Sequence, residues 1–150
     1  MTMREVQRYS LVEVDPASHL VRVTRDGVPL GFTVTGVRLE AQFELGDGSG
    51  LLWMTEDSPY DEGLHVYLLG RDGGLEDALE AGATFSPGIL ALRSLGAEWV
   101  EFEFFQNGFL YRLEVAKQAG FRLFPPAGWK YKRRWAKHRL AVTVARKEGA

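Results

Sequence analysis

The sequence predicts a mainly β protein: an antiparallel, hairpin-built sandwich or small barrel with one short helix at about 75–81. Three observations carry this prediction. Apolar and polar residues alternate along many short segments, turn sequences that contain glycine separate these segments, and the segments recur at regular spacing. A chain of 150 residues is long enough to bury one core, so we expect a single β-rich domain over 1–150.

The clearest strand spans 37–45, where apolar and polar residues alternate without a break. It ends in the glycine-rich loop 46–50, and the chain resumes at 51–54 as the second strand of a hairpin. The same pattern predicts further strands at about 6–14, 64–69, 89–95 and 139–145.

Two tight turns join strand pairs. Asp26-Gly27 separates 20–25 from 28–33, and Asn107-Gly108 separates 99–106 from 109–116. Both dipeptides accept the positive φ angles of a type I′ hairpin turn. The second turn predicts that Phe102 lies opposite Leu113.

The face of this hairpin that lies away from the core carries two apolar residues beside the turn. Phe105 and Leu110 form a predicted apolar contact spot that meets a second sheet or a partner. The neighbouring Glu101 and Glu103 are expected on the solvated side of the sheet.

The helix is predicted at 75–81 because Leu75, Ala78 and Leu79 share one helical face. Asp72 is a candidate N-cap and Gly82 a candidate C-terminal stop. A helix of only two helical turns is not stable by itself, so contacts with the rest of the protein must stabilise it.

The composition excludes several classes of site and protein. The chain has no cysteine, so disulfides, thiolate metal sites and cysteine nucleophiles are excluded. The N-terminal segment lacks the apolar run of a signal peptide, and no window approaches the roughly 20 apolar residues that span a bilayer. We therefore expect a cytoplasmic protein with no membrane partner.

Charge is distributed very unevenly along the chain. Residues 1–110 contain 7 Lys or Arg and 18 Asp or Glu, a net charge of −11, whereas residues 111–150 contain 11 and 2, a net charge of +9. Such a separation indicates charged partners or self-association rather than a particular fold.

Most of the basic residues interleave with rings over 129–139, which we call the basic aromatic segment. Cations neutralise phosphates and rings stack on unpaired bases, but both residue types also occur where rings anchor a core and cations cover it. The candidate binding residues of this segment are Trp129, Lys130, Tyr131, Lys132, Arg133, Arg134, Trp135, Lys137 and Arg139.

No catalytic, cofactor or metal site is predicted. The acidic segment 56–62 lacks the ligand spacing and the glycine of a calcium loop, so a solvated loop is the preferred interpretation. His65 shares a strand face with Tyr67 and is interpreted as solvent-facing. No glycine-rich segment leads into a helix with a phosphate-binding lysine.

These observations favour a non-catalytic β-module that binds a protein partner or itself through a charge-asymmetric surface. The first alternative is single-stranded nucleic-acid binding through the basic aromatic segment. The second alternative, a carrier of a small apolar ligand, rests on analogy with β-barrels.

Overall fold

The computed structural model describes residues 2–56, 63–82, 89–105, 108–120, 125–132 and 137–147. These residues form thirteen strands and one 3-10 turn, η1 (Pro16–Ser18). The strands are β1 (Arg4–Glu5), β2 (Tyr9–Asp15), β3 (Leu20–Arg25), β4 (Val28–Thr35), β5 (Arg38–Glu44), β6 (Gly50–Thr55), β7 (Gly63–Leu69), β8 (Leu75–Gly82), β9 (Ala91–Leu95), β10 (Trp99–Glu103), β11 (Phe109–Gly120), β12 (Trp129–Tyr131) and β13 (His138–Lys147).

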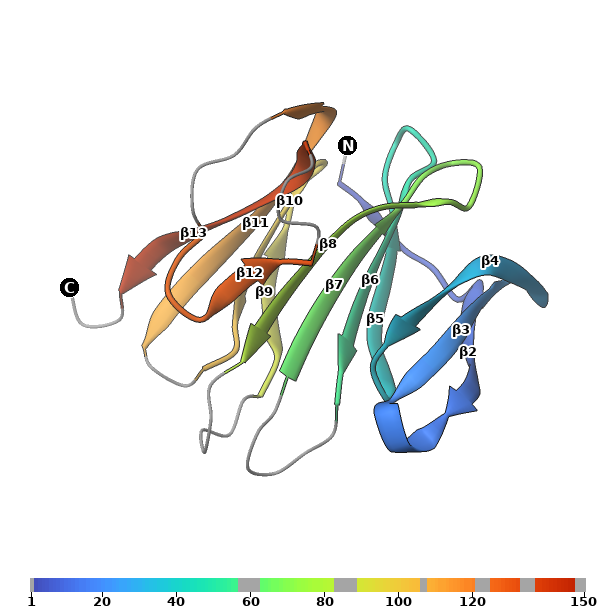
Figure 1. Ribbon diagram of the computed structural model, residues 1–150. Coiled ribbons are helices and arrows are strands. Elements are labelled where there is room, and N and C mark those ends of the chain that lie inside the picture. Colours follow the sequence, from blue (N-terminus) through green and yellow to red (C-terminus); the bar gives the residue numbers. More distant parts are fainter. Residues whose placement is uncertain are drawn as a thin grey trace.

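The strands form three antiparallel sheets, and none closes into a barrel among the described residues. The large sheet has the order β1-β5-β6-β7-β8-β12, the four-stranded sheet β13-β11-β10-β9, and the small sheet β2-β3-β4. Figure 1 shows the large sheet in the middle, with the small sheet on one side of it and the four-stranded sheet on the other. The predicted mainly β, antiparallel class is confirmed, and its sandwich form is the one observed.

The large sheet is central because β6 and β7 are buried along their whole length. Alternate residues of these strands belong to two hydrophobic cores, one on each face of the large sheet. Trp53 and Val66 pack toward the four-stranded sheet, whereas Met54 and Tyr67 pack toward the small sheet. Strands with apolar residues on both faces are expected to lie between two layers rather than at a surface.

The turn at Asp26-Gly27 has the predicted geometry. Asp26 has a φ of 52° and Gly27 a φ of 80°, and Arg25 lies opposite Val28 across a two-residue loop. Positive φ at both central residues defines the type I′ turn, whose twist matches that of the flanking strands.

The hairpin of β10 and β11 is present, but the predicted pairing is wrong by two residues. Phe102 lies opposite Tyr111 rather than Leu113, and Glu101 lies opposite Arg112. A slip of two residues leaves every side chain on its predicted face, so the hydrophobic pattern alone does not distinguish the two registers. The predicted turn residue Asn107 lies outside the described residues.

The helix predicted at 75–81 is wrong, because these residues form β8. β8 pairs with β7 along its length and with β12 on its other side. Ala78 and Leu79 point to opposite faces and both are buried. Helix propensity is a weak preference, and burial on both faces with strands on both sides outweighs it.

No helix among the described residues is long and apolar enough to span a bilayer.

Candidate functional site

Trp129, the first ring of the basic aromatic segment, is a core residue. It begins β12 and is 5% exposed. Its ring lies 5.6 Å from that of Phe102 and 5.8 Å from that of Tyr111, centroid to centroid. β12 is the last strand of the large sheet, and Trp129 packs its ring against the four-stranded sheet instead of presenting it to solvent.

Tyr131 joins β12 to β13. Its ring stacks on His138 with centroids 3.6 Å apart and an interplanar angle of 13°. Its hydroxyl donates a hydrogen bond of 2.6 Å to the carbonyl of Leu140. This half-buried ring is therefore held by a stacking contact and a hydrogen bond to β13.

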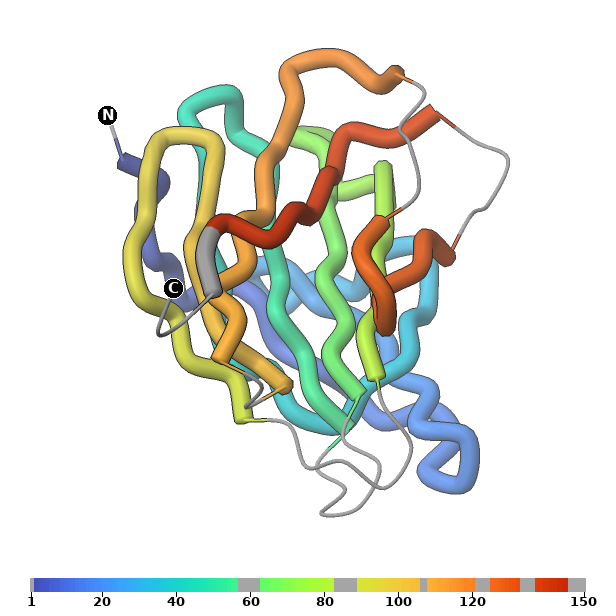
Figure 2. Tube along the Cα trace, turned by 90° about the vertical axis from the view of Figure 1, so that its left-hand side faces the viewer, coloured from blue at the N-terminus to red at the C-terminus, as the bar shows by residue number. Residues whose placement is uncertain are grey.

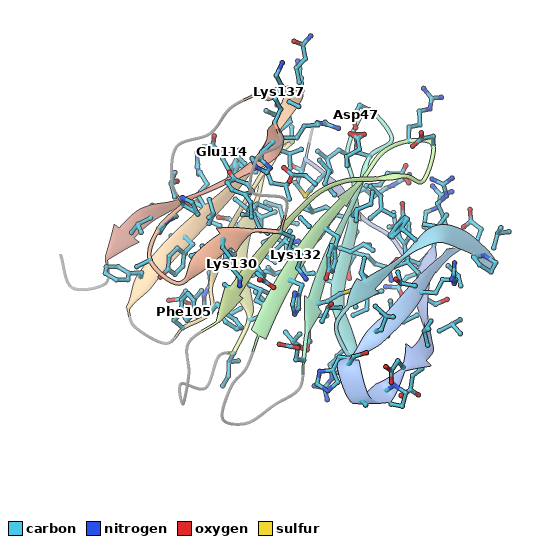
Figure 3. All side chains as sticks on the ribbon, in the orientation of Figure 1. Asp47, Phe105, Glu114, Lys130, Lys132 and Lys137 are labelled. Carbon is cyan, nitrogen blue, oxygen red and sulfur yellow. The ribbon has the colours of Figure 1, made fainter. Side chains whose placement is uncertain are left out.

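The two lysines of β12 and its end lie over the edge of the large sheet, as Figure 3 shows. Lys130 Nζ is 3.0 Å from one carboxylate oxygen of Glu80, and Lys132 Nζ is 3.5 Å from the other. Lys132 also donates a hydrogen bond of 2.9 Å to the hydroxyl of Tyr67. The two lysines thus share the single carboxylate of Glu80, and Lys130 remains 62% exposed.

Arg139 is similarly bound to the protein itself. Its guanidinium is 2.9 Å from Glu76 and 3.2 Å from Asp47, and its Nε donates to the carbonyl of Ala116. Lys137 is exposed and lies near the top of the view, well away from Lys130 and Lys132 (Figure 3). The predicted candidates Arg133, Arg134 and Trp135 lie outside the described residues.

The predicted apolar spot is divided between core and surface. Phe105 packs against the core, with ring centroids 5.9 Å from Tyr111 and 6.2 Å from Trp129. Leu110 is half-buried on β11. Phe105 therefore meets β12 of the second sheet, one of the two contacts expected for it.

A cluster of titratable groups lies where the large sheet meets the small one. We call it the polar cluster, and it consists of Glu56, His65, Tyr67, Glu80 and Lys132. His65 and Glu80 are cross-strand neighbours on β7 and β8. Glu56 also lies 3.3 Å from His19, which ends η1 just before β3, and the Tyr67 hydroxyl donates to the carbonyl of Thr35.

The interpretation of His65 as solvent-facing is wrong, because its side chain is 5% exposed. It lies 3.6 Å from Glu56 and 3.7 Å from Glu80, and neither ring nitrogen forms a hydrogen bond with a described residue. The face shared with Tyr67 was predicted correctly, but the small sheet that helps to cover this face was not foreseen.

Burial dominates the electrostatics of this cluster. It lowers the pKa of His65 to about 4, assisted by the positive charge of Lys132 and opposed by the two carboxylates. Burial also lowers the pKa of Lys132 and raises that of Tyr67. Burial alone would raise the pKa of Glu80, but the hydrogen bond from Lys130 and the charge of Lys132 keep this pKa below its usual value.

We expect stability to fall in weak acid because of His65. An unfolded histidine has a pKa near 6.5, so between pH 6.5 and about 4 the unfolded chain binds a proton that the folded chain does not. The stabilisation is present above pH 6.5 and is lost as the pH falls toward 4, by up to about 3 kcal/mol. Urea unfolding at a series of pH values measures this slope.

The test variant is His65→Leu, which should flatten the dependence of the unfolding free energy on pH. A His65→Leu protein with the pH dependence of the parent would contradict this account.

No group of three or more His, Asp or Glu side chains in the described part of the chain is arranged to hold a metal ion. Of the acidic segment considered at 56–62, only Glu56 is described, and the rest lies outside the described residues.

A second buried pair joins the large sheet to β13. Asp77 on β8 is 2% exposed and lies 2.9 Å from Nδ1 of His138, which is 3% exposed. Its second oxygen accepts hydrogen bonds from the backbone N–H groups of Arg139 and Leu140, at 2.8 and 2.9 Å. One carboxylate thus holds the first part of β13 against β8.

β13 is therefore an edge strand with two different halves. Its first part is covered by Asp77 and by the hydroxyl of Tyr131. Its second part, residues 141–147, is bonded through its backbone to β11 alone among the described residues. We call these residues the free half of β13. Figure 2 shows β13 crossing the front of the molecule at the margin of the four-stranded sheet.

Comparison of the chain with protein-family models, curated protein sequences and solved structures finds no match.

Proposed function

We propose that this protein is a non-catalytic interaction module that binds an extended segment of protein along the free half of β13. The observation that carries this proposal is that, among the described residues, only β11 pairs with the backbone of this edge. An edge strand presents a row of N–H and C=O groups that another strand can pair with, and such pairing is a common mode of peptide binding.

The residues of the free half suit this role. From Ala141 to Ala145 the run is Ala-Val-Thr-Val-Ala, with no charge, glycine or proline. Val144 is 44% exposed. β-branched residues favour extended pairing, and interior charge or proline is what normally blocks it.

Most other sheet edges in the described part of the chain are blocked. β1 has two residues and β12 has three, too few to hold a partner strand. β4 contains Pro29, which lacks an N–H donor, and β9 has five residues with Arg93 at its centre. β13 is long, and its run from Ala141 to Ala145 contains no proline and no charged residue.

The described residues of the basic aromatic segment give little support to the alternative of nucleic-acid binding. Its described rings pack inside the protein or against it, and Lys130, Lys132 and Arg139 are paired with the protein's own carboxylates. Counterion release from nucleic acid requires cations that are available to phosphates.

A labelled peptide of alternating threonine and valine, about seven residues long to match the free half, tests the proposal. We expect it to bind and to shift the backbone amide resonances of 141–147. Val144→Lys should weaken binding by about tenfold, because a charge in the middle of an edge opposes pairing. Fluorescence anisotropy measures the affinity.

The matched control is Val28→Lys on β4, a 63% exposed valine on another edge, which should leave the affinity unchanged. A proline-substituted peptide should not bind. Absence of binding at about 1 mM peptide, or resonance shifts confined to other strands, would refute the proposal.

A further inference from the structure

A pocket of about 440 Å³ lies where the turns β5–β6 and β7–β8 meet the small sheet. We call it the arginine pocket, because Arg8, Arg25 and Arg71 line it. These arginines come from the segment between β1 and β2, from the end of β3 and from the β7–β8 turn. Glu44 and residues 45–48 complete the lining. Figure 1 shows the two turns side by side at the top of the large sheet.

The pocket gathers basic residues from a part of the chain that has few of them. Residues 1–110 contain only seven basic residues, and all seven are arginines. Three of the seven line this one pocket, although Arg8 and Arg71 are far apart in the sequence. A guanidinium presents its N–H donors in a planar fork that matches the oxygens of a phosphate. The fold therefore collects donors suited to a phosphate in one place.

The two carboxylates at the pocket are held by arginines that surround it. Glu44 lies 2.9 Å from Arg4 and 2.8 Å from Arg8. Asp47 lies 3.2 Å from Arg139. Neither carboxylate therefore occupies the donors of the other two arginines that line the pocket.

Those two arginines, Arg25 and Arg71, form no ion pair with a carboxylate in the described part of the chain. Arg25 Nη1 donates a hydrogen bond of 3.1 Å to the backbone carbonyl of Arg71. Glycines give both side chains room to lie against the turns: a Cβ at Gly48 would be 3.0 Å from Cγ of Arg71, and one at Gly73 would be 3.1 Å from Nη2 of Arg25. The turns thus position two guanidinium groups and leave most of their donors available to a ligand.

We infer that the arginine pocket binds a small phosphate-bearing molecule, with Arg25 and Arg71 as donors to the phosphate. A phosphate has three acceptor oxygens and carries up to about two negative charges, so one group can accept hydrogen bonds from both arginines. The volume of the pocket lies within the range of small-molecule sites. No aromatic side chain is among its described lining residues, so the phosphate rather than a nucleobase is recognised.

This site is separate from the proposed peptide-binding edge. No residue of the free half of β13 is among the described residues that line the pocket. The inference therefore goes beyond the proposed function and does not depend on it.

Isothermal titration calorimetry of the full chain with inorganic pyrophosphate, at about 0.1 M sodium chloride, tests the inference. We expect saturable binding with a Kd of about 0.1 mM. Arg25→Gln and Arg71→Gln should each weaken binding by at least about tenfold, because each variant loses charge-assisted hydrogen bonds to the phosphate.

Arg22→Gln is the matched control. Arg22 lies on the same strand as Arg25, donates a hydrogen bond of 3.1 Å to the carbonyl of Leu30 and pairs with no carboxylate among the described residues, but it does not line the pocket. Its replacement should leave the affinity for pyrophosphate unchanged.

Three results would overturn the inference. One is the absence of saturable binding up to about 10 mM pyrophosphate. Another is a loss of affinity in Arg22→Gln as large as that in Arg71→Gln, which would indicate a general effect of charge. The third is binding of acetate as tight as that of pyrophosphate, which would contradict recognition of a phosphate.

Discussion

Replacing Asp77 by alanine is expected to lower the free energy of unfolding by about 3–5 kcal/mol, because several buried hydrogen-bond donors lose their acceptor at once. The carboxylate accepts hydrogen bonds from two backbone N–H groups of β13 and pairs with His138, and both side chains are almost wholly buried. Removing it leaves these donors in the interior without an acceptor. Urea unfolding measures the loss.

Asp77→Asn is the milder variant, because its amide retains one acceptor oxygen for the β13 backbone. It keeps the prediction testable if the alanine variant does not fold. Asp47→Asn is the matched control: it weakens an ion pair of Arg139 whose carboxylate is 51% exposed, and should cost less than about 1 kcal/mol. An Asp77→Ala protein within about 1 kcal/mol of the parent would show that the pair does not hold the sheets together.

The same variants connect this pair to the proposed function. Asp77 covers the first part of β13 and leaves the second part open. Amide hydrogen exchange at Arg139 and Leu140 should therefore be slow in the parent and fast in Asp77→Ala, whereas exchange in the free half should change little.

The sequence predicts the strands well because alternation of apolar and polar residues is a local property. The Asp26-Gly27 hairpin is an example, since the turn type is encoded by two adjacent residues. β8 was missed because its apolar positions fit a helix equally well. What decides between helix and strand there is pairing with β7 and β12, and β12 lies about fifty residues away in the sequence.

The candidate site was harder to predict because residue type does not reveal orientation. A tryptophan among lysines is compatible with a contact surface and with a core edge, and Trp129 proves to be core. His65 was assigned to the correct face, but its burial depends on the small sheet, which comes from a distant part of the chain. Asp77 had one available signal: a carboxylate inside an apolar segment is often a buried hydrogen-bond acceptor.

The free half of β13 combines one feature that sequence reveals with one that it does not. An uncharged β-branched run at 141–145 is visible in the sequence. That this run lies at a sheet edge depends on the order β13-β11-β10-β9, which no local pattern specifies.

Trp129→Ala is expected to cost about 3–5 kcal/mol of unfolding free energy, as large-to-small replacements of buried aromatic residues do. The ring fills the space between Phe102, Phe105 and Tyr111, so its loss opens a cavity that these rings cannot fill without rearrangement. Urea unfolding of the variant against the parent measures this loss.

Trp129→Phe is the informative partner variant. The indole Nε1 has no hydrogen-bond partner among the described residues, so phenylalanine removes an unsatisfied donor while retaining much of the packing. We expect it to cost less than about 1.5 kcal/mol. Lys130→Ala, at a 62% exposed side chain, should be nearly neutral.

These three variants also distinguish two roles for Trp129, a core residue and a contact with nucleic acid. A ring that stacks on bases contributes to binding of single strands and little to folding, so Trp129→Ala would then weaken oligonucleotide binding with stability unchanged. A core ring gives the opposite result: stability falls, and any residual affinity of the folded protein for oligonucleotides is the same in Trp129→Phe as in the parent. Measuring unfolding and oligonucleotide anisotropy on the same samples decides whether the basic aromatic segment serves the fold or a nucleic-acid ligand.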